Sequence, residues 1–186
     1  MNTIKNKLVA LAAMLAIATS AAVAAPKATD QKGDQPVAEQ VRHQLLKLPY
    51  YGIFDNLAYK VEGGTVTLYG QVVRPITRSD AATVVKRIKG VEQVINNIDV
   101  LPASSFDDAI RARTVRELYR MGSLYRYTRG VHPSLHIIVR GGHVTLEGVV
   151  ATKTDKQLAY LAASRVPGVF SVTNNLRAER GESVAY

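Results

Sequence analysis

The stretch VEGGTVTLYGQV at residues 61–72 recurs as VRGGHVTLEGVV at residues 139–150. The two copies are offset by 78 residues, and the match runs without a gap from 61–98 to 139–176, with 15 of 38 aligned positions identical. The two copies share the positions of their glycines, the alternation of their apolar residues and the spacing between them. The sequence therefore predicts a duplicated structural unit.

Each copy contains the pattern of a β-hairpin followed by a helix and a strand. Apolar residues alternate on both sides of a Gly-Gly pair, which predicts two strands joined by a tight turn. Gly70 and Gly148 fall on the inward phase, where we expect them to let a helix approach the sheet closely. The spacing of Ala81, Val84, Val85 and Ile88 predicts a helix and recurs 78 residues later. GVEQVINNI and GVFSVTNNL predict the closing strands, and the repeated Asn pairs are expected to make hydrogen bonds there.

A further helix is predicted before each hairpin, over residues 37–48 and 110–121. Each unit then has the order αββαβ. The predicted fold class is α+β, with two tandem units that each form a three-stranded mixed sheet carrying two helices on one face. The expected boundaries are 36–101 for the first domain, 102–105 for the linker, 106–180 for the second domain and 181–186 for a tail.

Residues 1–24 have the pattern of an export signal. Lys5 and Lys7 precede an apolar run at residues 8–18, which is shorter than the roughly 20 residues of a membrane-spanning helix. Ala22-Val23-Ala24 matches a signal-peptidase site, so we expect cleavage after Ala24 and a periplasmic protein. Polar residues 25–35 would form a flexible leader.

The order αββαβ, the hairpin pattern V-x-GG-x-VTL-x-G-x-V and the ending G-V-x-x-V-x-NN-[IL] resemble the BON domain. Two such domains behind an export signal are similar to the OsmY-like periplasmic group. The resemblance implies a non-enzymatic protein that binds phospholipid or envelope surfaces and supports envelope integrity under osmotic stress.

The residues that carry chemistry in other proteins form no recognisable site. Cysteine is absent, which excludes disulfides and Cys-ligated zinc. The four histidines, His43, His132, His136 and His143, are expected at the solvated surface, with a zinc or copper site as the alternative. Asp107-Asp108 is interpreted as a helix cap. No nucleophile, P-loop or metalloprotease motif is present. No catalytic residue, metal or cofactor is predicted.

Net charge distinguishes the two units. Residues 35–103 hold 8 basic and 6 acidic side chains, whereas residues 104–180 hold 12 and 6. The excess lies in RARTVRELYRMGSLYRYTRG at residues 111–130. Guanidinium groups pair with phosphate, and tyrosine suits the depth of lipid headgroups. The predicted anionic-lipid contacts are one helical stripe followed by loop residues: Arg113, Arg116, Arg120, Tyr125, Arg126, Tyr127 and Arg129.

Three other interpretations stay open. The basic stretch can be a solvated helix face, or a patch that docks on the first unit. The chain can also be a periplasmic chaperone-like or protein-interaction module, with envelope proteins as partners, because open sheet edges accept added strands. Nucleic acid fits Arg and Tyr chemistry but is not expected as the partner of an exported protein.

Overall fold

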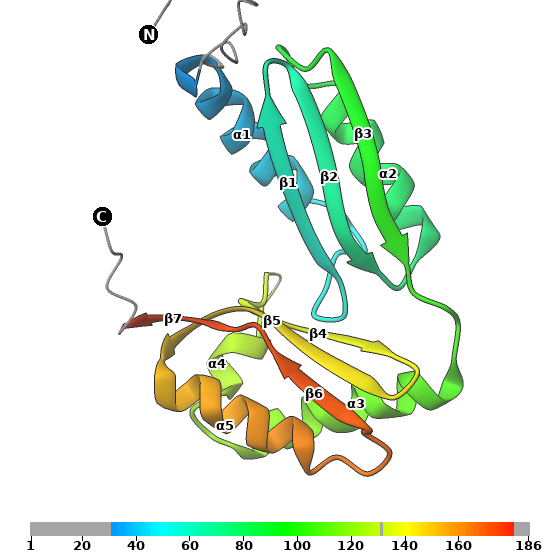
Figure 1. The fold of residues 1–186 in the computed structure, drawn as a ribbon, viewed down its shortest axis with the longest axis vertical. Coiled ribbons are helices and arrows are strands. Elements are labelled where there is room, and N and C mark those ends of the chain that lie inside the picture. Colours follow the sequence, from blue (N-terminus) through cyan, green and yellow to red (C-terminus); the bar gives the residue numbers. More distant parts are fainter. Residues whose placement is uncertain (1–30, 131, 181–186) are drawn as a thin grey trace, which may run out of the picture.

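The computed structural model describes residues 31–130 and 132–180 as two domains joined by a short linker (Figure 1). The predicted signal peptide, the first part of the leader and the tail lie outside these residues. No helix in the described part of the chain has both the length and the apolar character needed to cross a membrane.

The first domain is a mixed three-stranded sheet with both helices on one face. β1 (Asn56–Glu62) pairs antiparallel with β2 (Thr65–Val72), which pairs parallel with β3 (Gln93–Val100). α1 (Gln31–Leu46) and α2 (Pro75–Lys86) cover the face that buries Val66, Leu68 and Val72 (Figure 1). Helix α1 begins five residues before the predicted domain start. The Asp34 carboxylate in its first turn accepts a hydrogen bond from Gly63 N in the hairpin turn, at 3.3 Å.

The second domain repeats this plan with two local changes. α3 (Ser105–Arg120) and α5 (Lys153–Ser164) cover a sheet of β4 (Leu135–Arg140) and β5 (His143–Thr152). The third strand is split into β6 (Ser171–Asn174) and β7 (Arg177–Arg180), both parallel to β5. Part of the predicted loop forms a short helix, α4 (Tyr125–Thr128). The predicted fold class, tandem αββαβ units with mixed sheets, is confirmed.

Gly70 and Gly148 serve a different purpose from the one predicted. Both have φ of +114°, and a Cβ atom on Gly70 would lie 1.9 Å from the Asn56 carbonyl oxygen. The corresponding distance from Gly148 to the Ser134 carbonyl oxygen is 2.1 Å. The close neighbour is thus the backbone at the start of the adjacent strand, and not a helix. Glycine is needed at both positions because the backbone at the start of β1 or β4 leaves no room for a Cβ atom.

The repeated asparagines make the predicted hydrogen bonds. Asn96 donates from Nδ2 to the Arg78 carbonyl at 2.9 Å, and Asn174 donates to the Lys156 carbonyl at 2.8 Å. Each also accepts a hydrogen bond from the backbone two residues later, at 3.2 Å. The first asparagine of each pair therefore connects the closing strand to the first turn of the preceding helix, β3 to α2 in the first domain and β6 to α5 in the second.

The two domains meet between the loop that precedes β1 and the strand β4. Ile137 N donates to the Ile53 carbonyl at 2.7 Å, and Phe54 packs against the core of the second domain. Arg140 forms an ion pair with Asp99. The prediction of solvated histidines is wrong for His136, which is buried here because its ring stacks on Tyr51 of the first domain.

Candidate functional site

Helix α3, which carries three of the predicted contact residues, is fixed at its start by two polar side chains. Ser104 is the N-cap and accepts a hydrogen bond from Asp107 N at 3.2 Å. Asp107 and Asp108 lie in the first turn of α3, where acids complement the helix dipole as predicted. The N-cap itself is Ser104, and the buried Asp107 carboxylate accepts from Gly141 N and Gly142 N, each at 2.8 Å. A carboxylate at the start of α3 thus holds the hairpin turn, as Asp34 does in the first domain.

The outer stripe of α3 presents the three arginines predicted to contact lipid. Ile110, Thr114 and Leu118 are buried on the inner side, while Arg113, Arg116 and Arg120 are exposed. Arg113 donates to the Pro167 carbonyl at 3.1 Å, and Arg120 pairs with Glu117 at 2.7 Å. Both contacts are at the surface, where such bonds exchange readily with water or another anion.

Tyr125 and Arg129 extend this basic stripe beyond the end of α3. The Arg129 guanidinium carbon lies 4.5 Å from the centre of the Tyr125 ring, and Tyr125 meets Tyr119 edge to face at 5.3 Å. Tyr119 was not predicted as part of the site. Its position between Arg116 and Arg120 on the helix surface was the available sequence indication.

Arg126 and Tyr127 are held by a buried carboxylate. Asp155 Oδ2 accepts hydrogen bonds from Tyr127 Oη and Thr152 Oγ1, both at 2.8 Å, and from an Arg126 nitrogen at 3.0 Å. Burial raises the pKa of Asp155, but these hydrogen bonds and the Arg126 charge outweigh it and leave the pKa below its ordinary value. Tyr127 is only 8% exposed, so its ring is not available to a headgroup. Arg126 remains exposed at the same site.

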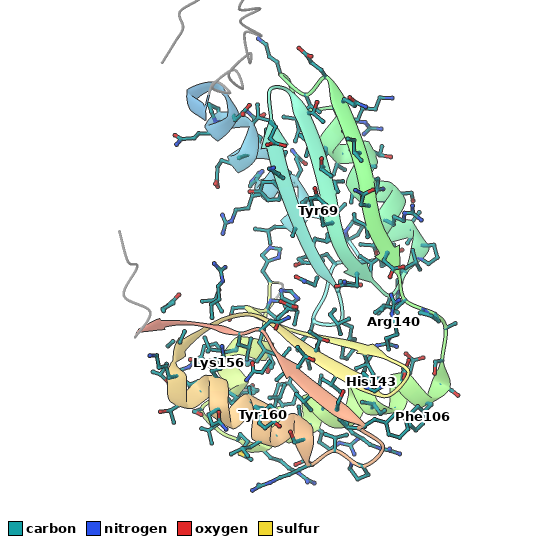
Figure 2. All side chains as sticks on the ribbon, viewed as in Figure 1. Tyr69, Phe106, Arg140, His143, Lys156 and Tyr160 are labelled. Atoms are coloured by element: carbon teal, nitrogen blue, oxygen red, sulfur yellow. The ribbon has the colours of Figure 1, made fainter. Side chains whose placement is uncertain are left out.

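Helix α5 contributes residues that the sequence analysis did not include. It packs beside α3 on the same face of the sheet, and Tyr160 and Leu161 are exposed on it (Figure 2). Lys153 and Arg165, at its two ends, are exposed as well. We call the following exposed residues the basic helical face: Arg113, Arg116, Tyr119, Arg120, Tyr125, Arg126, Arg129, Lys153, Tyr160 and Arg165.

The first domain does not cover the basic helical face. Figure 1 shows α3 and α5 on the side of the second sheet away from the first domain. Contacts between the domains involve the loop before β1, the end of β3 and the strand β4. Among the described residues, Asp99 with Arg140 is the ion pair that joins the domains, and neither residue belongs to this face. The interpretation of the arginine stripe as a patch that docks on the first unit is therefore wrong.

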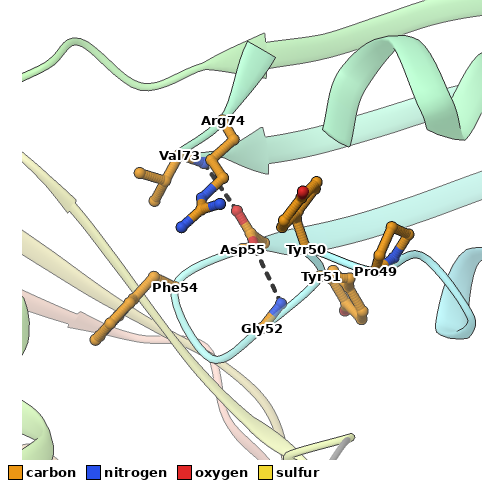
Figure 3. A pocket seen from close by; sticks show the side chains of 8 residues that line it. All are labelled: Pro49, Tyr50, Tyr51, Gly52, Phe54, Asp55, Val73 and Arg74. Carbon is orange, nitrogen blue, oxygen red and sulfur yellow. Dashed lines mark hydrogen bonds between the residues drawn. The ribbon is translucent and has the colours of Figure 1, made fainter. Parts of the chain in front are cut away.

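A pocket of about 350 Å³ lies beside the loop before β1 (Figure 3). Its carboxylate, Asp55, accepts from Val73 N at 2.8 Å and from Gly52 N at 3.0 Å. Burial raises the pKa of Asp55 above its ordinary value, against the effect of these two amides. Arg74 lies over the Tyr50 ring at 4.8 Å. With both carboxylate oxygens bonded to the backbone, Asp55 shapes the loop that reaches the second domain.

The described residues bring no three potential metal ligands of the His, Asp and Glu types together. His143 is exposed, and its Nδ1 lies 2.7 Å from Ser171 Oγ. His43 and His132 are also exposed and lie in other parts of the molecule.

A family model of the BON domain matches residues 33–102 and, a second time, residues 107–180. The chain belongs to the BON domain family and contains two tandem copies of the domain. BON domains are non-catalytic binding domains, and the family is known in general for binding membranes and phospholipids. No curated protein matches this chain by sequence.

Two solved structures similar to the chain are of CdsD, a structural protein of the type III secretion system of Chlamydia trachomatis. One, of the C-terminal domain, is 11% identical, covers 75% of this chain and 96% of its own, and has a TM-score of 0.30. The other is 11% identical, covers 78% and 94%, and has a TM-score of 0.29. Such low scores say nothing about the function of this chain.

Proposed function

We propose that this protein binds anionic phospholipid at the bacterial envelope through the basic helical face of its second domain. The first domain acts as a scaffold or a partner-docking surface. The protein itself is non-enzymatic, and its binding supports envelope integrity under osmotic stress.

The single observation that carries this proposal is the exposure of the arginine stripe on α3, away from the first domain. Arg113, Arg116 and Arg120 point out of one helix face, and Arg126 and Arg129 follow beside α4. Exposed side chains on the outer side of a helix suit a membrane surface better than a small ligand, which is normally held in a concave pocket.

The strength of such binding can be estimated from the charges. Each basic residue close to an anionic leaflet contributes about 1 kcal/mol, and the attraction falls off within a Debye length of about 8 Å at physiological salt. Five exposed arginines therefore suffice for measurable binding without insertion of a helix. Guanidinium groups also pair with phosphate oxygens in bidentate fashion, which favours phosphate-bearing surfaces over a general negative potential.

Vesicle co-sedimentation tests the proposal. The full mature chain should pellet with vesicles of phosphatidylglycerol and phosphatidylcholine, and much less with phosphatidylcholine alone. Pelleting should weaken strongly when the salt concentration rises to about 1 M, because the Debye length then falls to about 3 Å. Equal pelleting with both vesicle types, or none with either, would overturn the proposal.

We propose a periplasmic location on the strength of the sequence pattern at residues 1–24. Fractionation of expressing cells should recover a processed chain, cut after Ala24, in the periplasmic fraction. Recovery of the unprocessed chain in the cytoplasm would contradict this part of the proposal.

A further inference from the structure

Two exposed phenylalanines form one patch at the end of the second domain. Phe170, just before β6, is 69% exposed, the highest value among the large exposed apolar side chains of the described residues, and Phe106 in the first turn of α3 is 45% exposed. Their ring centres are 6.0 Å apart, and the His143 ring meets Phe170 edge to face at 5.9 Å. Figure 2 shows Phe106 and His143 together at this end of the domain. An exposed large apolar pair is the kind of surface feature that indicates an interaction.

The two rings rest on backbone that has no side chain. A Cβ atom on Gly142 would lie 2.6 Å from Phe170 Cδ2 and 3.2 Å from Phe106 Cε1. A Cβ on Gly168 would lie 3.3 Å from Phe106 Cε2. Gly142 is also fixed by the hydrogen bond that its backbone N donates to the Asp107 carboxylate. The rings therefore pack against the hairpin turn, and Phe170 N also donates a hydrogen bond to the Gly142 carbonyl in that turn, at 2.9 Å.

The first domain shows that the fold does not require this patch. Glu92 occupies the position equivalent to Phe170, and its Cγ lies 3.1 Å from the position of a Cβ on Gly64. The same glycine turn therefore carries a charged residue in one domain and an exposed phenyl ring in the other. The fold therefore accepts a charged side chain at this position, and the phenyl ring of Phe170 is not needed for folding.

Cationic side chains lie beside the phenylalanines. Arg113 lies two helical turns after Phe106 on α3 and donates a hydrogen bond to the Pro167 carbonyl. Arg165 is exposed at the end of α5, two residues before Pro167. The nearest exposed acid on α3, Asp108, is paired with the buried Arg111. An apolar pair flanked by guanidinium groups matches an anionic bilayer, whose headgroups lie directly above an apolar layer.

We propose that Phe106 and Phe170 enter the boundary between headgroups and acyl chains when the basic helical face binds an anionic membrane. This inference rests on the proposed function and adds an apolar contact to it. Because burial of apolar surface is not screened by salt, the phenyl rings should leave a part of the affinity that persists at high salt.

The sequence contains no tryptophan, so a single substitution introduces a unique fluorescent reporter. Phe170→Trp places the reporter in the patch, and Tyr69→Trp places a control on the open sheet face of the first domain, where Tyr69 is 40% exposed. With phosphatidylglycerol vesicles, the emission of F170W should shift to the blue and be quenched by brominated acyl chains. The emission of Y69W should do neither.

The outcomes separate this inference from the proposed function. If F170W pellets with the vesicles but its emission is unchanged, the insertion is overturned while lipid binding stands. If neither variant nor the wild type pellets, both fail. A blue shift that needs no vesicles and grows with protein concentration would mean that a second copy covers the patch, which also overturns the insertion.

A second pair of variants measures the contribution of the ring. Phe170→Glu reproduces the residue of the first domain and should weaken vesicle affinity by about tenfold more than Ile95→Glu, a matched apolar-to-acid change on the open sheet face. It should also remove the binding that persists at high salt. Equal weakening by the two variants would contradict the inference.

Discussion

The ring of His136 in the second domain stacks on the ring of Tyr51 in the first, with ring centres 5.5 Å apart and an angle of 29° between the planes. Nδ1 of His136 lies 3.3 Å from the Gly52 carbonyl oxygen, and Nε2 lies 3.4 Å from Tyr51 Oη. Burial raises the pKa of Tyr51 to about 12, so its hydroxyl keeps its proton. A titratable ring thus forms part of the contact that orients the two domains.

Acidification should loosen this contact. Burial lowers the pKa of His136 below its ordinary value, although the Gly52 carbonyl and Asp55 act to raise it. The docked domains therefore favour the neutral ring. The contribution of the neutral His136 ring to docking should be fully present above about pH 6.5, the ordinary pKa of histidine, and should be lost as the pH falls through the lowered pKa of His136.

Spin labels can measure the distance between the two domains. The chain has no cysteine, so labels attach only at cysteines that are introduced. Labels at Tyr69→Cys and Tyr160→Cys, both exposed sites in different domains, should give a narrow distance distribution at neutral pH and a broader one at about pH 5. His136→Phe keeps a stacked ring that does not titrate, so its distribution should not change with pH. A pH response that persists in H136F would show that His136 is not its source and would contradict the prediction.

The hydrogen bonds on Asp155 should stabilise the second domain. Asp155→Asn replaces an acceptor of Tyr127 and Thr152 with an amide and should lower the free energy of unfolding by about 2 kcal/mol. Glu62→Gln, at an exposed carboxylate of β1, should change it by less than about 0.5 kcal/mol. Urea unfolding followed by circular dichroism measures both.

The effect of Asp155→Asn should depend on pH. The pKa of Asp155 lies below its ordinary value, so its contribution is present above about pH 4 and is lost as the pH falls further. The difference between wild type and D155N should therefore narrow in acid. A difference that is constant with pH would show that the carboxylate charge is not involved.

Alanine at Gly70 should disrupt the first domain. A Cβ there meets the Asn56 carbonyl at 1.9 Å, and φ of +114° is unfavourable for any other residue. We expect a loss of about 3 kcal/mol or more in the free energy of unfolding. Gly122→Ala, where no atom lies within 4 Å of the added Cβ, is the control and should be close to neutral. Equal stability of the two variants would refute the close-approach role of Gly70.

Most of the fold was predicted from the internal repeat. The alternation around Gly63-Gly64 and Gly141-Gly142 identified both hairpins, because side-chain period and turn residues are local properties. The start of α1 was missed because its first residues, QKGDQ at 31–35, are polar and carry no apolar stripe, and because the contact of Asp34 with Gly63 joins residues 29 positions apart. The partners of Asp107, Gly141 and Gly142, are likewise distant from it in the sequence.

The candidate site was predictable only in part. The helical spacing of Arg113, Arg116 and Arg120 identified one exposed stripe, but spacing cannot show that Tyr127 turns inward to Asp155. The position of His136 was mispredicted for a related reason. Its alternation correctly places it on the sheet face away from the helices, but that face is covered here by the other domain.

Charge reversal on α3 tests the central claim most directly. Arg113→Glu with Arg116→Glu should abolish pelleting with phosphatidylglycerol vesicles at low salt, because it replaces two of the guanidinium groups assigned to headgroup phosphates. Lys60→Glu with Arg177→Glu changes the net charge equally on exposed strand positions of the two sheets and should bind nearly as wild type. If both double variants lose binding to the same extent, or neither does, the basic helical face is not the lipid-binding surface.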